Sequence, residues 1–116
     1  MKKGALIGLI GLGLTLSGAT AADYNDAAKM KANWKTHCYS CHGSDGKGKT
    51  KAGRKAKVQD LTDSKVQALY TDAQLLDQLK NGMKSTSGGE LMKPYSDKMS
   101  EAEMKDLVAF VRTLGK

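Results

Sequence analysis

The spacing of apolar and polar residues predicts three main helices, the first of them near the N-terminus. Ala27, Met30, Trp34 and Cys38 follow one another at intervals of three or four residues, which places them on one helical face. Asn25 has the chemistry of an N-cap, so we expect this helix to begin directly after it. The helix is expected to continue through the residues that follow Cys38.

Two capping boxes predict the starts of the other two helices. Thr71–Gln74 and Ser100–Glu103 each place Gln or Glu three residues after a hydroxyl residue, so that the two side chains satisfy free backbone N–H groups. Gly82 and Gly115 are expected to end these helices. The predicted inner faces are Leu75, Leu76 and Leu79 in the second helix, and Met104, Leu107, Val108, Val111 and Leu114 in the third.

The stretches between the helices are expected to be irregular. Gly43–Lys57 contains four glycines, which break any periodicity. Met83–Met99 contains Pro94, the only proline of the chain, which forbids helix continuation. Between these loops, Asp60–Leu69 predicts a turn followed by a short helical stretch. The expected fold class is therefore all-α, with a few helices and long loops.

The N-terminal residues differ in pattern from the rest. Met1–Lys3 is a short basic start, Ala5–Leu16 is apolar apart from glycine and Thr15, and Ser17–Ala21 ends in small residues. This order is typical of a secretory signal peptide cleaved after Ala21 or nearby. The apolar run is too short to span a bilayer comfortably, so we expect no stable membrane insertion. The predicted division is a signal peptide at 1–21 and a domain at 22–116, located in the periplasm.

Composition describes a small basic domain. The 116 residues carry a formal charge of +7, and removal of Lys2 and Lys3 leaves 17 basic and 12 acidic residues, or +5. A basic surface suits protein partners with acidic docking surfaces. Export separates the chain from nucleic acid, so no nucleic-acid partner is expected. The basic residues are densest in the first loop, at Lys47, Lys49, Lys51, Arg54, Lys55 and Lys57.

The strongest chemical signal is the run Cys38–His42, which has the pattern Cys-x-x-Cys-His. Two thiols three positions apart lie on one helical face, and an imidazole follows immediately. This pattern is the sequence signal for covalent attachment of a c-type haem. Cys38 and Cys41 can each bind one vinyl group, and His42 can reach the iron from one side. Because a chain this short buries little apolar surface, one haem per chain would also complete its core.

Three other interpretations of the two cysteines are weaker. A redox dithiol belongs in a strand–helix setting, and no βαβ pattern surrounds this motif. A zinc site needs four ligands, and the chain has no second cysteine pair. A disulfide between Cys38 and Cys41 would leave His42 unexplained.

The local sequence leaves several candidates for the second axial ligand of the haem iron. His37 adjoins Cys38 and cannot easily reach the far face of the same haem, so we interpret it as a surface or hydrogen-bonding residue. Met30 and Met104 occupy helical faces and are expected in the core. Met92 lies within a loop, beside the stiffening Pro94, and is favoured. Met83 and Met99, at a helix stop and before a helix start, remain alternatives.

The motif and its surroundings resemble small bacterial class I c-type cytochromes. The resemblance covers nearly all of the chain after the signal peptide, and Cys-x-x-Cys-His is its specific part. The matching segments are Trp34–Gly43, Asp45–Gly48, Asp60–Thr62, Lys80–Gly82, Met92–Tyr95 and Leu107–Arg112.

The resemblance implies a cytochrome c fold wrapped around one covalently bound haem, with the first and last helices crossing. It implies thioether links at Cys38 and Cys41, His42 as the proximal iron ligand and Met92 as the distal one. The chain departs from the family in three places. Met30 replaces a small residue at the crossing, and Lys93 stands where many members have proline. No proline between His42 and Met92 can supply the carbonyl that often accepts the histidine N–H.

The expected function is electron transfer, with no substrate bond broken and hence no enzymatic activity of its own. A soluble periplasmic carrier would pass single electrons between redox partners through His/Met-ligated iron. One alternative is a haem subunit dedicated to one periplasmic oxidoreductase complex. Another is a gas-binding or peroxidatic haem protein with an open sixth position, against which Met92 argues.

Overall fold

A computed structural model of the chain describes residues 8, 11, 13 and 21–116. The expected signal peptide therefore lies almost wholly outside the described residues, and its cleavage stays a prediction. Within the described part of the chain, no helix is both long enough and apolar enough to cross a membrane.

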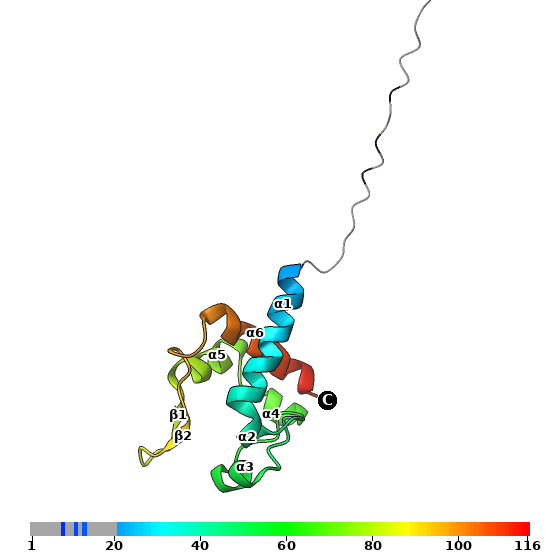
Figure 1. Cartoon of the computed structure of the whole chain (residues 1–116). Coiled ribbons are helices and arrows are strands. Elements are labelled where there is room, and N and C mark those ends of the chain that lie inside the picture. The colour runs from blue at the N-terminus through cyan, green and yellow to red at the C-terminus, as the bar shows by residue number, and fades with distance from the viewer. Residues whose placement is uncertain (1–7, 9–10, 12, 14–20) are drawn as a thin grey trace, which may run out of the picture.

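The described residues form a mostly helical fold with one small hairpin (Figure 1). The prediction of a helical chain is confirmed, and the three long helices lie where the apolar spacing and the capping boxes indicated. The elements are α1 (Ala21–Asn33), η1 (Trp34–Cys38), α2 (Tyr39–His42), α3 (Lys51–Ala56), α4 (Ser64–Gln67), α5 (Asp72–Asn81), β1 (Met83–Lys84), β2 (Glu90–Met92) and α6 (Glu101–Leu114).

The first three elements form one continuous helical rod that ends in the Cys-x-x-Cys-His motif. The rod begins at Ala21, so the prediction of Asn25 as its N-cap was wrong. Alanine is the strongest helix former, and the two alanines at the start extend the helix backwards. Within η1 the backbone hydrogen bonds change to the π-helical pattern, and the N–H of Tyr39 donates to the carbonyl of Trp34, five residues before it. Single π-turns inside helices are frequent at functional sites.

The rod crosses α6, and the two helices are joined at the crossing by polar side chains (Figure 1). Ser100 caps α6 by accepting the N–H of Glu103. The carboxylate of Glu103 does not complete the expected capping box. Instead it accepts hydrogen bonds from the amide of Asn33 at 2.9 Å and the hydroxyl of Ser100 at 3.2 Å, and it pairs with the ammonium of Lys29 at 3.3 Å. At Thr71 the predicted capping box is complete.

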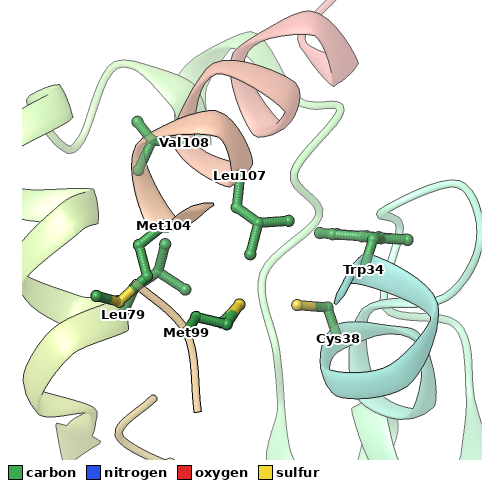
Figure 2. Close-up of a cluster of buried hydrophobic side chains, with 7 residues drawn as sticks. All are labelled: Trp34, Cys38, Leu79, Met99, Met104, Leu107 and Val108. Atoms are coloured by element: carbon green, nitrogen blue, oxygen red, sulfur yellow. The ribbon is translucent and has the colours of Figure 1, made fainter. Parts of the chain in front are cut away.

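The core lies between η1, α5 and α6 (Figure 2). Leu107 is its most deeply buried large side chain, with 1% of its surface exposed. The ring of Trp34 meets Phe110 edge-on with 5.0 Å between centroids. Phe110 was not in the predicted inner face of the last helix, whereas Met104, Leu107 and Val108 of that face are buried as predicted. The buried hydrophobic residues are Trp34, Cys38, Leu79, Met99, Met104, Leu107 and Val108.

The prediction of an unbroken loop at Gly43–Lys57 was wrong, because α3 lies within it. Thr50 caps this helix by accepting the N–H of Gly53 at 2.9 Å. A Cβ at Gly53 would overlap the carbonyl oxygens of Cys41 and Gly48, so this glycine permits close packing. The sequence interpretation took glycine as a sign of irregular chain, whereas here it lets a short helix touch the motif.

The second predicted loop also contains regular structure. β1 and β2 pair antiparallel, with Met83 opposite Met92 and Lys84 opposite Glu90, and an irregularity in register separates the two pairs. Strands of two and three residues are too short to produce a visible alternation of apolar and polar positions. The fold is therefore mostly helical with one short two-stranded sheet.

Candidate cofactor site

A cleft of about 850 Å³ lies between the end of the helical rod, α5, the hairpin and the last turns of α6. All four predicted site residues, Cys38, Cys41, His42 and Met92, line this cleft. Three of them come from the rod, and Met92 comes from β2. A smaller apolar pocket of about 70 Å³ adjoins the cleft and is lined by Trp34, among other residues.

The end of the motif helix is held rigidly, because its last four carbonyl groups all accept hydrogen bonds. Such groups have no partner within a helix and must find one elsewhere. The donors are the N–H of Gly43 for Tyr39, the hydroxyl of Thr50 for Ser40 and Cys41, and the N–H of Gly48 for His42, at 2.7–3.2 Å. The indole N–H of Trp34 also bonds the carbonyl of Gly43 at 3.2 Å.

The two cysteines are free thiols, not a disulfide. Cys38 has only 5% of its surface exposed, and this burial, with a smaller contribution from Cys41, raises the pKa of its thiol to about 12. A redox-active dithiol requires a lowered thiol pKa, so the environment of Cys38 disfavours that alternative. Among residues 21–116, no group of three His, Cys, Asp or Glu side chains is placed to hold a metal ion.

His42 offers one ring nitrogen to the cleft. Its Nδ1 is buried and has no hydrogen-bond partner among the described residues, which leaves Nε2 as the accessible nitrogen. Burial lowers the pKa of this histidine, which favours the neutral ring that a metal ligand must have. The Trp34 ring lies beside it, with 5.9 Å between centroids. The buried, unpaired Nδ1 agrees with the lack of a proline carbonyl in the sequence.

The candidate methionines lie in two different environments. Met99 and Met104 are buried in the core, and Figure 2 shows the sulfur of Met99 directed toward that of Cys38. Met92 and Met83 line the cleft from opposite strands of the hairpin. Gly82 has φ +73°, and a Cβ there would lie 2.5 Å from the Met92 carbonyl oxygen. This glycine therefore allows Met92 to approach the end of α5.

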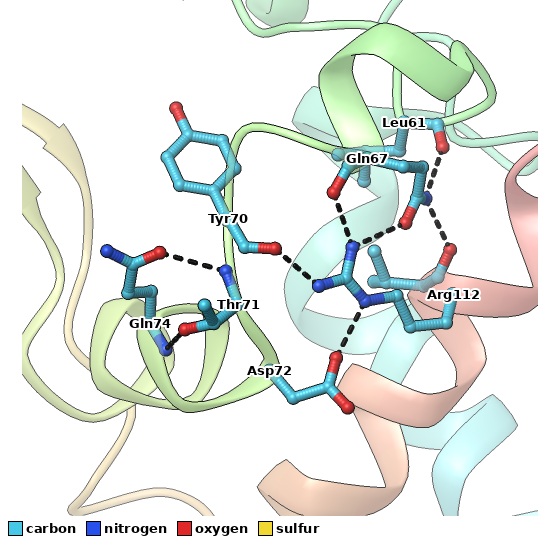
Figure 3. A network of polar contacts seen from close by, with 8 residues as sticks. Leu61, Gln67, Tyr70, Thr71, Asp72, Gln74 and Arg112 are labelled. Atoms are coloured by element: carbon cyan, nitrogen blue, oxygen red, sulfur yellow. Dashed lines mark hydrogen bonds and ion pairs between the residues drawn. The ribbon is translucent and has the colours of Figure 1, made fainter.

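Arg112 holds one wall of the cleft in place through a network of hydrogen bonds, a role that the sequence analysis did not predict (Figure 3). Its guanidinium donates to the Asp72 carboxylate at 2.7 Å, to the backbone and side-chain oxygens of Gln67 at 2.6 and 2.9 Å, and to the Tyr70 carbonyl. Gln67 in turn donates to the carbonyls of Leu61 and Val111. These partners are up to 45 residues apart, so no local pattern could have indicated them.

The donor groups of the cleft fit a covalently bound haem. Two free thiols, an accessible imidazole nitrogen and a thioether face the same space. The cleft is also lined by more basic than acidic side chains, as two haem propionates would favour. The charged lining residues are Lys57, Lys93, Lys98 and Arg112 against Glu90.

Comparison with known proteins assigns the family. The sequence model of the family described as Cytochrome c matches residues 27–115. The chain belongs to the cytochrome c family. As a c-type cytochrome it carries covalently bound haem c and transfers electrons, and the resemblance to small class I members is confirmed.

Solved c-type cytochromes share the fold of this cytochrome. The KustC0563 c-type cytochrome is 30% identical with a TM-score of 0.65, and the match covers 74% of this chain and 96% of that one. A mutant of Kustc0563 is 29% identical with a TM-score of 0.64, covering 74% of this chain and 98% of the mutant.

A longer curated relative is also similar to this cytochrome. It is the Cbb3-type cytochrome c oxidase subunit FixP of Azorhizobium caulinodans, which is 31% identical over 101 residues. The match covers 87% of this chain but 31% of that subunit, so this chain spans about a third of its relative's length.

Proposed function

We propose that this cytochrome is a soluble periplasmic carrier of single electrons with one His/Met-ligated haem. The observation that carries the proposal is the meeting of Cys38, Cys41, His42 and Met92 at one cleft. The cysteines and the histidine are neighbours in sequence, but Met92 is 50 positions beyond His42. Only the fold brings these four groups to the same space.

Each of the four residues has a distinct role in the proposal. Cys38 and Cys41 form the two thioether links, His42 binds from the proximal side through Nε2, and Met92 binds from the distal side. Bound haem supplies an iron that takes up and releases one electron. A neutral thioether favours the ferrous form, and Met/His ligation accordingly raises the reduction potential. The hydrogen-bonded helix end would hold His42 in place as the proximal ligand.

A basic surface beside the cleft is the proposed docking site for acidic protein partners. It consists of Lys47, Lys49, Lys51, Arg54, Lys55 and Lys57. Among the described residues, none of these six cations forms an ion pair, so their charge remains available to a partner. Surfaces of one charge steer association and release partners readily as salt rises.

The test of the ligand proposal is the visible spectrum of the reduced protein with and without carbon monoxide. A closed His/Met site predicts a c-type spectrum that the gas leaves unchanged. A clear shift on adding carbon monoxide would contradict Met92 ligation and favour a gas-binding or peroxidatic function.

A second candidate function is that of a haem subunit in one oxidoreductase complex. It is favoured by the similarity to the FixP oxidase subunit, of which this chain matches about a third. Purification of the native protein from its host distinguishes the two functions. A free carrier elutes alone at the size of one chain, whereas a dedicated subunit copurifies with a fixed partner.

A further inference from the structure

Tyr95 connects the segment that carries Met92 to the helix that carries the cysteines. Its hydroxyl donates to the carbonyl of His37 at 3.0 Å, across 58 positions of sequence. Its ring lies against the His37 ring with 5.4 Å between centroids. His37 directly precedes Cys38, and Tyr95 follows Met92 by three residues. The side chain is half-buried and lines the cleft.

The backbone of Tyr95 is held as firmly as its side chain. Its N–H donates to the carbonyl of Leu79 in α5 at 2.8 Å. Its carbonyl accepts the N–H groups of Lys98 and Met99, each at 3.0 Å, in the turn before α6. Tyr95 is therefore joined to the rod, to α5 and to the approach to α6.

Met92 lies between two fixed points. On one side, the chain passes closely against Gly82 at the end of α5. On the other side stands Tyr95, with the stiff Pro94 directly before it. Of the hydrogen bonds that Tyr95 makes, only the hydroxyl bond to His37 joins the distal segment directly to the motif helix. The separation between the two segments determines how closely a distal side chain can approach the proximal one.

We propose that Tyr95 is a positioning residue whose hydroxyl bond to His37 holds Met92 over the distal side of the haem. The proposal rests on the assignment of Met92 as distal ligand. Without the hydroxyl bond, the distal segment separates from the rod more often, and the distal position is open for a larger fraction of the time. External ligands then compete better with Met92.

The test is the substitution Tyr95→Phe in the haem-loaded protein. It deletes the hydroxyl and keeps the ring against His37. Imidazole binding to the oxidised protein is the measurement, because imidazole must displace the distal side chain. We expect the apparent association constant of imidazole to rise about fivefold. This corresponds to about 1 kcal/mol, the net contribution of one hydrogen bond.

Tyr70→Phe is the matched control. The Tyr70 hydroxyl also makes one hydrogen bond at 3.0 Å, to the side chain of Gln59, at another wall of the same cleft. It is not attached to the distal segment, so we expect imidazole binding to stay unchanged. An equal rise in both variants would mean that Tyr95 merely contributes to general stability, and would overturn the proposal.

A double-mutant cycle with Met92→Ala separates this proposal from the function on which it rests. If Tyr95 acts through Met92, Tyr95→Phe has no further effect on imidazole binding once Met92 is alanine. A fivefold rise that persists in the Met92→Ala background would contradict action through Met92. If Met92→Ala itself leaves imidazole binding unchanged, the ligand assignment fails. If Met92→Ala changes imidazole binding but Tyr95→Phe does not, the ligand assignment stands and the positioning role of Tyr95 is contradicted.

Discussion

At the scale of single residues, the decisive question is which methionine the hairpin presents to the cofactor. Met92 and Met83 stand opposite each other and both line the cleft. Met92 also lines the small apolar pocket beside Trp34 and His42, whose lining does not include Met83. Met92 thus shares both pockets with the proximal histidine, whereas Met83 shares only the cleft, which supports the assignment of Met92 as the distal ligand.

We therefore expect Met92→Ala to open the distal position. The reduced variant should bind carbon monoxide, and its reduction potential should fall by on the order of 100 mV, because axial ligands strongly tune haem potentials. Optical spectra and a redox titration measure both effects. Met83→Ala is the matched control, with little change in either. The reverse result would identify Met83 as the distal ligand.

At the scale of elements, the cleft wall depends on the last turns of α6 through Arg112. Lysine has one ammonium in place of a planar fork, so Arg112→Lys keeps the charge and loses most of the bonds to the α4–α5 segment. We expect the free energy of unfolding to fall by about 1.5 to 3 kcal/mol, the range for hydrogen bonds to a charged group.

Denaturant unfolding tests the role of Arg112, with Asp72→Asn as the comparison. Asp72 is 74% exposed, so removing its charge should cost less than about 1 kcal/mol. An equal loss of unfolding free energy in the two variants would mean that the exposed ion pair, and not the hydrogen bonds to Gln67 and Tyr70, holds this wall of the cleft in place.

The crossing of α1 and α6 should be sensitive to acid. Hydrogen bonds from Asn33, and then Lys29 and Ser100, lower the pKa of Glu103 below its ordinary value of 4.5. A lowered pKa contributes stability above the unfolded-state value, and this stability is lost as pH falls through the folded-state value. Glu103→Gln should therefore lose less stability between about pH 6 and about pH 3 than the unaltered protein.

Thermal unfolding at the two pH values measures this difference for Glu103→Gln. Asp106→Asn on the same helix is the control, since among residues 21–116 its carboxylate forms no hydrogen bond or ion pair. If both variants change acid sensitivity equally, the effect comes from net charge and not from the helix crossing.

At the scale of the whole molecule, charge is distributed unevenly around the cleft. The basic surface from Lys47 to Lys57 lies beside the motif, whereas carboxylates form ion pairs with Lys29 of α1, Lys80 of α5 and Lys105 of α6. Lys51→Glu should slow electron transfer to an acidic partner several-fold at low salt, and the difference should shrink as salt screens the charges.

Stopped-flow kinetics against ionic strength checks this expectation for Lys51→Glu. Lys31→Glu on α1 makes the same change in net charge at another exposed position and is the control. An equal loss of rate in both variants would show that net charge alone matters, without a particular docking surface.

The parts of this molecule that the sequence predicted are those fixed by neighbouring residues. The Cys-x-x-Cys-His motif, the Thr71 capping box and the inner face of α6 each depend on contacts within a few positions. The missed parts depend on distant contacts. α3 exists because Gly53 packs on Cys41, the hairpin brings Met83 opposite Met92, and Tyr95 reaches His37 across 58 positions.

The burial of Cys38 has a consequence for how the protein is made. In the folded chain this thiol is covered by side chains of the core, including Met99 and Leu107 (Figure 2). Because the core covers the other sides of this sulfur, an enzyme that joins the cofactor to Cys38 must approach it through the cleft. A chain whose cleft narrowed before the cofactor arrived would therefore hide its own attachment site.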